Sequence, residues 1–359
     1  MNIEENKPLA PFTTFGIGGP ARWFVEAHCE DDVAEAAAWA GARKLPLFVL
    51  GGGSNLLISD AGFDGLVLHI ALKGIATHEP AADKRLYQVA AGEDWSRFVE
   101  RTTDDNCAGL ECLAGIPGTV GGTPVQNVGA YGQEVASVIE CVRVFDLEMR
   151  VFEELSASDC GFAYRRSRFN SIDRDRFIVT RVDYRLTPGG APTVRYSDLQ
   201  RAFAADLEAG RIPTLSAVAN EVRRIRQTKG MLLVEGDPDC RSAGSFFKNP
   251  IVPEALADAI AAASPLPLPR FPAGTDQAGT GQNSGALVKL PAAWLIEQAG
   301  FHKGDALGPA AVSTRHTLAL TNRGNATAAE ILALAGQIRS SVQTRFGIEL
   351  EMEPVMLGF

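Results

Sequence analysis

The sequence predicts an α+β protein built from more than one domain. With 359 residues, the chain is too long for one ordinary hydrophobic core, so two or three domains are expected. Its 46% hydrophobic and 21% charged residues are typical of a globular protein. Short apolar runs bounded by glycine turns alternate with helical segments, which favours a mixed fold with many short strands.

The first half of the chain contains two predicted helices and several predicted strands. An alanine-rich stretch that opens with acidic residues predicts a helix over 32–43, because negative side chains stabilise a helix N-terminus. A second helix is predicted over 95–103. Apolar runs predict strands over 46–50, 66–70, 86–91, 139–145 and 177–186.

The second half is more helical. A basic helix is predicted over 214–229, and a stretch rich in Pro, Gly, Ser and Thr over 263–284 indicates a surface loop or insertion. Helices follow over 292–299 and from Thr327, where Glu330 completes a capping box. A final strand is expected to include Ile348 and Leu350. One buried helix face is predicted for Ile331, Leu334, Ala335, Ile338 and Val342.

Composition limits the possible functions. A net charge of −9 argues against broad nucleic-acid binding, because the phosphate backbone requires a basic surface. The six cysteines are scattered without metal-ligand spacing, so no metal site is expected. Neither a signal peptide nor a membrane span is evident, and a soluble, cytoplasmic protein that binds small molecules is expected.

Two glycine loops give the first chemical signal. Gly51, Gly52, Gly53, Ser54 and Asn55 follow an apolar strand, and a second loop contains Gly115, Ile116, Pro117, Gly118, Gly121 and Gly122. Glycines let backbone N–H groups turn toward an anion, so the loops are candidates for holding a pyrophosphate. The P-loop and dinucleotide-fold fingerprints are both absent. Ordinary glycine turns between strands remain the alternative.

Aromatic and basic residues supply further candidates. Tyr131 lies between small residues, where its ring either faces a ligand or covers a core edge. Tyr164 precedes Arg165, whose planar guanidinium could clamp a carboxylate, although such arginines are more often solvated. Tyr196 stands just before a predicted helix, with Ser197 as a candidate N-cap.

The stretch 242–250 reads Ser-Ala-Gly-Ser-Phe-Phe-Lys-Asn-Pro. Its small residues allow close approach to a ligand, and its two phenylalanines could anchor the segment in a core. It could therefore be a rigid platform that presents a hydroxyl to a buried anionic ligand. A turn that enters a strand is the alternative reading.

Taken in order, seven segments resemble those of the UDP-N-acetylenolpyruvoylglucosamine reductase (MurB) family. They are 14–19, 51–55, 115–122, 126–132, Tyr164-Arg165, 244–250 and Glu353-Pro354-Val355. The resemblance implies an FAD-binding region of the vanillyl-alcohol-oxidase/PCMH type over 1–226, with subdomains of about 1–72 and 73–226. It also implies an α+β substrate domain over 227–345 and a C-terminal strand and tail over 346–359.

The resemblance implies a reaction and its residues. NADPH would reduce FAD, which would then reduce UDP-N-acetylglucosamine enolpyruvate to UDP-N-acetylmuramate for peptidoglycan synthesis. Arg165 and Glu353 would stabilise the enolate, and Ser245 would protonate C2. The serine would be aided by the Lys248 and Asn249 neighbourhood, by water or by the strong basicity of the carbanion. Glu351 is a rival to Glu353, because Val355 stands where many relatives have an arginine.

Binding roles are carried over in the same way. The two glycine loops, including Ser54 and Asn55, would hold FAD. Substrate would contact a set of polar and aromatic residues, and the subclass with a tyrosine-bearing loop is indicated. A monomer is expected. The implied substrate residues are Tyr131, Tyr164, Tyr196, Lys229, Asn249 and Gln298.

Two other function classes remain open at this stage. An FAD-linked oxidase or dehydrogenase would share the first part of the chain but would not need Ser245 or Arg165. A non-catalytic UDP-sugar binder would keep Lys229 and Asn249, yet would have no use for two flavin-type glycine loops.

Overall fold

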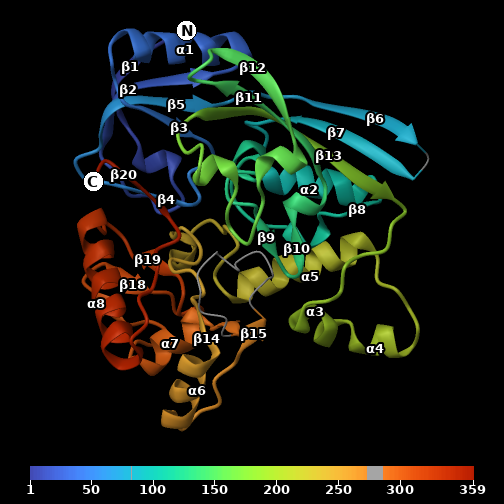
Figure 1. Ribbon diagram of the computed structural model, residues 1–359, viewed down its shortest axis with the longest axis vertical. Coiled ribbons are helices and arrows are strands. Elements are labelled where there is room, and N and C mark those ends of the chain that lie inside the picture. Colours follow the sequence, from blue (N-terminus) through green and yellow to red (C-terminus); the bar gives the residue numbers. More distant parts are fainter. Residues whose placement is uncertain (82, 273–285) are drawn as a thin grey trace. The chain divides into compact units, whose positions relative to one another are not determined.

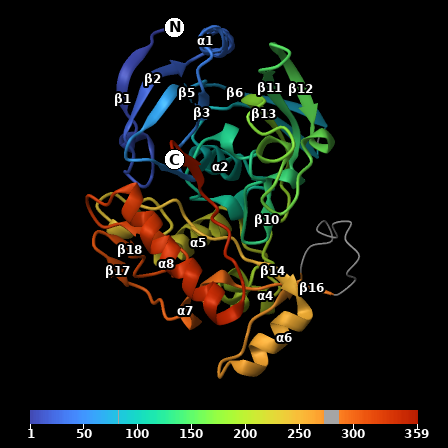
Figure 2. The same cartoon turned by 60° about the vertical axis from the view of Figure 1, so that its left-hand side comes forward.

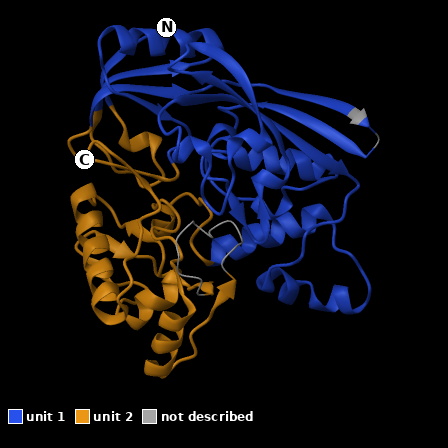
Figure 3. Cartoon of the chain, in the orientation of Figure 1, with its two compact units in different colours: residues 1–7, 21–53, 63–228 blue, residues 8–20, 54–62, 229–359 orange. Residues whose placement is uncertain are grey.

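Two units of mixed helix and strand make up the chain, which confirms the predicted α+β class (Figure 3). The computed structural model describes residues 1–81, 83–272 and 286–359. Each unit is discontinuous in sequence. Unit 1 comprises Met1–Lys7, Ala21–Gly53 and Phe63–Thr228, and unit 2 comprises Pro8–Pro20, Ser54–Gly62 and Lys229–Phe359.

The first sheet of unit 1 is built around two parallel pairings. Its strand order is β1 (Glu4–Pro8), β2 (Pro20–Ala27), β5 (Phe63–Ile70) and β3 (Leu47–Leu50). Both β2 and β3 run parallel to β5, and the crossover between them is α1 (Glu30–Ala42). Three acidic residues occupy the first turn of this helix, where they stabilise the positive end of its dipole.

The second sheet of unit 1 is antiparallel, and its long strands cross the upper part of Figure 1. Its strand order is β12 (Val151–Ser156), β11 (Ile139–Asp146), β13 (Phe177–Pro188), β7 (Lys84–Ala90) and β6 (Ile75–Ala81), with β8 (Cys107–Ala108) also paired to β13. The helix α2 (Trp95–Asp104) packs on it, with Phe98 and Tyr184 rings 5.2 Å apart. Asp94 caps that helix by accepting from the Arg97 amide.

The rest of unit 1 consists of short elements and one longer helix. They are β9 (Gly129–Ala130), β10 (Gln133–Glu134), α3 (Ser197–Ala202), α4 (Ala204–Glu208) and α5 (Leu215–Thr228). Tyr196 occupies the N-cap position of α3 and Ser197 is its first residue, with no side-chain cap hydrogen bond. The expectation that Ser197 caps this helix is therefore wrong.

The described part of unit 2 contains three small sheets and three α-helices. The sheets are β14 (Ile251–Pro253), β16 (Leu287–Lys289) and β15 (Phe271–Pro272); β17 (Ala306–Leu307), β18 (Ala310–Val312) and β19 (Leu320–Asn322); and the parallel pair β20 (Val355–Leu357) and β4 (Leu56–Ile58). The helices are α6 (Glu254–Ala263), α7 (Ala292–Gln298) and α8 (Ala328–Phe346).

The helix α8 follows the sequence prediction closely. Thr327 and Glu330 form the predicted capping box, and Gly347 ends the helix at a φ of 67°. The five residues predicted for its apolar face are all buried in the core of unit 2. Figure 2 shows the helix lying along the small sheet that contains β18.

Two element predictions need correction. Ile348 and Leu350 are buried, but neither lies in a strand; the last strand is β20. Apolar residues indicate that a segment is buried, but a buried segment can have an irregular backbone as well as a strand conformation. In the predicted loop over 263–284, Phe271 and Pro272 form β15 instead, while 273–284 lies outside the described residues.

Within the described ranges, none of the helices combines the length and hydropathy needed to cross a membrane.

Candidate active site

The two glycine loops of unit 1 pack backbone against backbone. A Cβ atom added to Gly52 would lie 2.6 Å from the Cα of Gly118, and one added to Gly51 would lie 2.8 Å from the Oγ1 of Thr119. Gly53 and Gly118 also have positive φ values of 58° and 130°. The close contacts disfavour a side chain at Gly51 and Gly52, and the backbone conformations favour glycine at Gly53 and Gly118.

The loops also present backbone donors. Among the described residues, the amides of Gly52 and Gly53 have no hydrogen-bond acceptor. The second loop is held in place because Trp95 donates its amide to Gly118 O at 3.1 Å and Gly121 donates to Ala91 O at 2.8 Å. Fixed, unpaired amides beside glycine backbone fit the diphosphate of a dinucleotide such as FAD.

Arg226 is a buried cation at the second loop. Its side chain is 9% exposed, and its Nε donates to Gly115 O at 3.0 Å. Burial lowers the pKa of the guanidinium, while a hydrogen bond with Tyr131 acts in the opposite direction. The sequence pattern predicts only a basic helix around this residue. Its position one turn after the buried Val222 is the signal that could have identified it.

Two of the predicted tyrosines meet in unit 1. The rings of Tyr131 and Tyr196 pack edge to face, with centroids 5.2 Å apart and an interplanar angle of 82°. Tyr131 is 9% exposed, whereas Tyr196 is 42% exposed. The pair therefore has one fixed ring and one ring that is accessible to a ligand.

Arg165 is fixed by main-chain acceptors. Its guanidinium donates from Nη1 to Asn127 O at 3.1 Å and from Nη2 to Gly129 O, and it lies 5.2 Å from the ring centroid of Tyr164. Arg165, Asn127 and Tyr131 all have positive φ values, of 97°, 44° and 49°. Such strained non-glycine residues cluster at functional sites, where the fold holds them in place.

In unit 2, the predicted serine and glutamate segments lie side by side. The amide of Glu353 donates to Phe246 O at 2.9 Å, and Phe247 forms an isolated antiparallel bridge with Met352. Phe246 and Phe247 are fully buried, so they anchor the segment that carries Ser245. Ser245 and Glu353 thus belong to one hydrogen-bonded pair of chain segments.

The rival glutamate is oriented differently. Glu351 is 71% exposed in its side chain and forms an ion pair with Lys248 at 2.5 Å. Glu353 is half-buried. The Lys248 ammonium is therefore occupied at the surface by Glu351, which weakens the expectation that it assists Ser245.

Asn249 and Asn55 have structural partners as well. The Ala292 amide donates to Asn249 Oδ1 at 2.9 Å, which leaves Nδ2 as the donating side of that amide. Asn55 lies in unit 2, where its Nδ2 donates to Glu353 O at 3.3 Å and its carbonyl accepts from Val355 N at 2.9 Å. The segment that carries Glu353 is thereby tied to Asn55, a link the sequence did not indicate.

The remaining predicted residues are distributed over both units. Tyr164 and Arg165 belong to unit 1, and Ser54, Lys229 and Gln298 belong to unit 2, with Gln298 half-buried at the end of α7.

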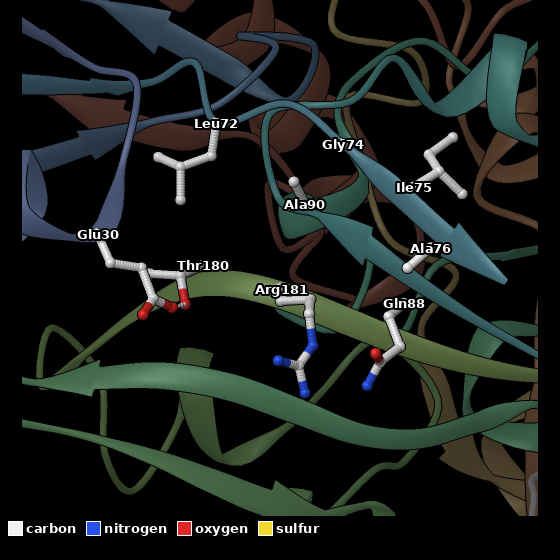
Figure 4. A pocket seen from close by; sticks show the side chains of 9 residues that line it. All are labelled: Glu30, Leu72, Gly74, Ile75, Ala76, Gln88, Ala90, Thr180 and Arg181. Atoms are coloured by element: carbon white, nitrogen blue, oxygen red, sulfur yellow. Dashed lines mark hydrogen bonds between the residues drawn. The ribbon is translucent and has the colours of Figure 1, made fainter. Parts of the chain in front are cut away.

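A hollow of about 460 Å³ lies on the second sheet of unit 1 and contains none of the predicted site residues (Figure 4). Its charged groups are already paired. Glu30 accepts from Arg143 at 2.7 Å and from Thr180 at 2.8 Å, and the Arg143 hydrogen bond holds the pKa of Glu30 below its ordinary value. Arg181 likewise donates to Asp183 at 2.6 Å. This hollow therefore adds nothing to the candidate site.

Two family models match this chain, one in its N-terminal half and one in its C-terminal part. Residues 237–357 match the model described as UDP-N-acetylenolpyruvoylglucosamine reductase, C-terminal domain. Residues 21–149 match the model described as FAD binding domain.

Similar proteins cover nearly the whole chain. A UDP-N-acetylenolpyruvoylglucosamine reductase from Streptomyces coelicolor is 44% identical, over 98% of this chain and 89% of that protein. The reductase of the same name from Thermobifida fusca is 42% identical, over 99% and 98%. The crystal structure of UDP-N-acetylenolpyruvylglucosamine reductase (MurB) from Thermus caldophilus is 26% identical, with a TM-score of 0.65 and 99% coverage of both chains.

Proposed function

The chain belongs to the UDP-N-acetylenolpyruvoylglucosamine reductase family, and we propose that Ser245, Arg165 and Glu353 carry out its protonation chemistry. It is an FAD-dependent oxidoreductase of peptidoglycan precursor synthesis that reduces the enolpyruvyl ether of UDP-N-acetylglucosamine, with NADPH as co-substrate. The observation that carries the proposal is the hydrogen bond from Glu353 N to Phe246 O, which holds the glutamate against the serine segment.

The flavin-binding residues follow from the packed glycine loops. Gly51, Gly52 and Gly53 would hold the diphosphate of FAD on one side, and the loop over 115–122 would hold it on the other. Arg226 would keep that second loop in place through Gly115 O. Bound at these loops, FAD would supply the hydride chemistry between NADPH and C3 of the enolpyruvyl group.

Arg165 would neutralise the charge that develops on the substrate. Hydride addition at C3 leaves an electron pair at C2, which is delocalised into the carboxylate as an enolate. A guanidinium that two carbonyl groups already hold in position needs little reorganisation to stabilise that charge. The planar group also matches the geometry of a carboxylate.

Ser245 would complete the addition by giving its hydroxyl proton to C2. The C2 carbon gains the C–H bond, and the serine oxygen recovers a proton from water. The buried phenylalanines that follow Ser245 anchor its backbone on the C-terminal side. Glu353 would have to be protonated, or to share a proton, in order to stabilise an enolate rather than repel it.

The nucleotide part of the substrate would be held by polar side chains. Asn249 would donate from Nδ2, because Ala292 N occupies its Oδ1. Lys229 would supply a positive charge for the pyrophosphate, and Tyr196 would cover the sugar nucleotide with its exposed ring. Tyr131, Tyr164 and Gln298 complete the proposed substrate set.

The protein's setting is also proposed. We expect a cytoplasmic monomer whose partners are small molecules, with NADPH and the UDP-sugar enolpyruvate as its specific substrates. We further keep a functional division into an FAD-binding region over 1–226 and a substrate region over 227–345, followed by the tail that carries Glu353.

One assay separates this function from the two alternatives. Purified protein is supplied with NADPH and its flavin spectrum is recorded, with and without UDP-N-acetylglucosamine enolpyruvate. We expect NADPH oxidation that depends on the enolpyruvate and forms UDP-N-acetylmuramate in equal amount. Oxygen consumption without the enolpyruvate would indicate an oxidase, and a protein without flavin would indicate a binder.

A further inference from the structure

The N-terminal motif Thr14-Phe15-Gly16-Ile17-Gly18-Gly19 has no role in the chemistry described so far. It lies in unit 2, although most of β1 before it and most of β2 after it belong to unit 1. Thr14 donates its hydroxyl to Ser242 O at 2.5 Å. The motif thus contacts the segment that carries Ser245 from a position more than 200 residues away in sequence.

A second contact holds the other side of Ser245. Phe15 is fully buried, and its ring packs edge to face on Phe246 with centroids 6.3 Å apart. Its carbonyl accepts from Asn322 Nδ2 at 3.0 Å, which fixes the loop in turn. The threonine hydroxyl and the phenylalanine ring therefore hold the backbone on the two sides of Ser245.

The motif also rests on the strand beside the glutamate tail. A Cβ atom on Gly19 would lie 2.3 Å from Asp60 O, and one on Gly18 would lie 2.8 Å from the Cβ of Ile58. Ile58 belongs to β4, which pairs with β20 immediately after Glu353. The same short loop thus contacts the Ser245 segment directly, and it also contacts the strand that pairs with β20.

The backbone just before Ser245 needs such a restraint. Gly244 has a φ of 73°, and a Cβ atom there would meet nothing within 4 Å. Glycine tolerates several backbone conformations, and the Gly244 amide is restrained by Ser242, whose Oγ accepts from it at 3.2 Å. The bond from Thr14 to Ser242 O fixes the peptide on the near side of this hinge.

We propose that Thr14 is a positioning residue for proton delivery, acting through Ser242 to hold the Ser245 hydroxyl in place. The inference rests on the proposed role of Ser245. It assigns Thr14 no contact with substrate or cofactor. Loss of the hydroxyl would therefore slow the step that needs the proton and leave flavin reduction by NADPH unchanged.

The test compares three variants in rapid-mixing experiments. Thr14→Val removes the hydroxyl but keeps the branched shape, and Thr14→Ser keeps the hydroxyl. Thr13→Val is the matched control, because every hydrogen bond of the Thr13 hydroxyl to a described residue stays inside its own loop. The hydroxyl donates to Ala10 O at 3.1 Å and to Ile17 O at 3.2 Å, and it accepts from Ile17 N at 3.4 Å. Thr14→Ala serves as a second hydroxyl-free variant if Thr14→Val does not fold.

We expect Thr14→Val to slow hydride transfer to the enolpyruvate about tenfold and to increase its solvent deuterium isotope effect, with NADPH-driven flavin reduction unchanged. Thr14→Ser and Thr13→Val are expected to stay within about threefold of the parent rate. Equal slowing of both half-reactions, or a Thr14→Val rate like that of the parent, would overturn the inference.

Ser245→Ala separates this inference from the function on which it rests. If Ser245→Ala still reduces the enolpyruvate at the parent rate, the proposed proton donor is wrong and Thr14 has nothing to position. If Ser245→Ala is inactive in that step while Thr14→Val is normal, only the role of Thr14 fails.

Discussion

Two glutamates in the C-terminal tail differ in environment despite their closeness in sequence. Glu353 is held by Phe246 O and is half-buried, whereas Glu351 is exposed and paired with Lys248. We therefore expect Glu353→Gln to slow reduction of the enolpyruvate by at least about 100-fold, within the usual range for a lost acid–base group.

Glu351→Gln is the matched control, because it makes the same change at the neighbouring exposed carboxylate. Its rate is expected to stay within about threefold of the parent rate, since a surface ion pair contributes little. Single-turnover measurement of the enolpyruvate step checks both. A larger loss in Glu351→Gln than in Glu353→Gln would reverse the assignment.

His316 should make stability depend on pH. Burial, followed by the nearby cations Lys229 and Lys303, lowers the pKa of His316 from 6.5 to about 4, while Glu297 acts in the opposite direction. Its Nδ1 accepts from the Leu318 amide at 3.2 Å, which also favours the neutral ring. The unfolded chain therefore binds an extra proton between about pH 6.5 and pH 4, and stability falls as the pH drops through that range.

His316→Asn keeps an acceptor for Leu318 N but does not titrate. Between pH 7 and pH 5, we expect the free energy of unfolding of the parent to fall by about 2 kcal/mol more than that of the variant. Urea unfolding at the two pH values measures this difference. Equal slopes for both proteins would show that His316 does not titrate in this range.

The sequence indicated which side chains belong to the candidate site, but not their hydrogen-bond partners or their burial. Resemblance placed Ser245, Glu353 and Arg165 in one reaction, and the structure puts the first two in adjoining segments. The pairing of Lys248 with Glu351 could not be read from the sequence, because it depends on which backbone lies opposite. The burial of Arg226 was missed because an arginine in a polar helix is usually solvated.

At the scale of elements, the two glycine loops depend on each other. Gly52→Ala would place a methyl group 2.6 Å from the Cα of Gly118, so the loops must separate. We expect a loss of about 1–3 kcal/mol in stability and weaker FAD retention, measured by thermal unfolding and by the flavin content of purified protein.

Gly336→Ala provides the control, since a Cβ atom there meets nothing within 4 Å and the residue lies inside α8. It is expected to raise stability by up to about 1 kcal/mol, because alanine favours a helix. If Gly52→Ala kept full flavin content and stability, the loops would not need their close contact.

Elements with strong local signals were predictable, and those that depend on distant pairing were not. The capping box and the spacing of apolar residues were enough to predict α8, because both signals lie in or next to the helix. The parallel pair of β4 and β20 joins segments from opposite ends of the chain, and neither is long enough to show a periodic pattern. The apolar residues Ile348 and Leu350 indicated burial but not strand geometry.

At the scale of the whole molecule, unit 2 is assembled from three separate parts of the chain. Phe15, Ile17 and Leu57 are almost fully buried in its core, although they precede the large C-terminal part by more than 170 residues. The family model of the C-terminal domain covers only 237–357. A contiguous C-terminal range therefore leaves out residues that belong to the core of unit 2.

A fragment of residues 229–359 should consequently fold poorly. It lacks those three core side chains and the strand that pairs with β20. We expect no cooperative thermal transition by circular dichroism, because each missing large side chain costs about 2–5 kcal/mol. Cooperative unfolding of this fragment would mean that the N-terminal segments are dispensable for unit 2.

The proposed reaction depends most on Ser245, which we expect to give its proton to C2 of the substrate. Rapid mixing of the Ser245→Ala variant tests it by measuring the two half-reactions separately. We predict that NADPH reduces the flavin at the parent rate, while transfer to the enolpyruvate falls by at least about 100-fold. Equal loss in both half-reactions, or parent-like reduction of the enolpyruvate, would contradict the claim.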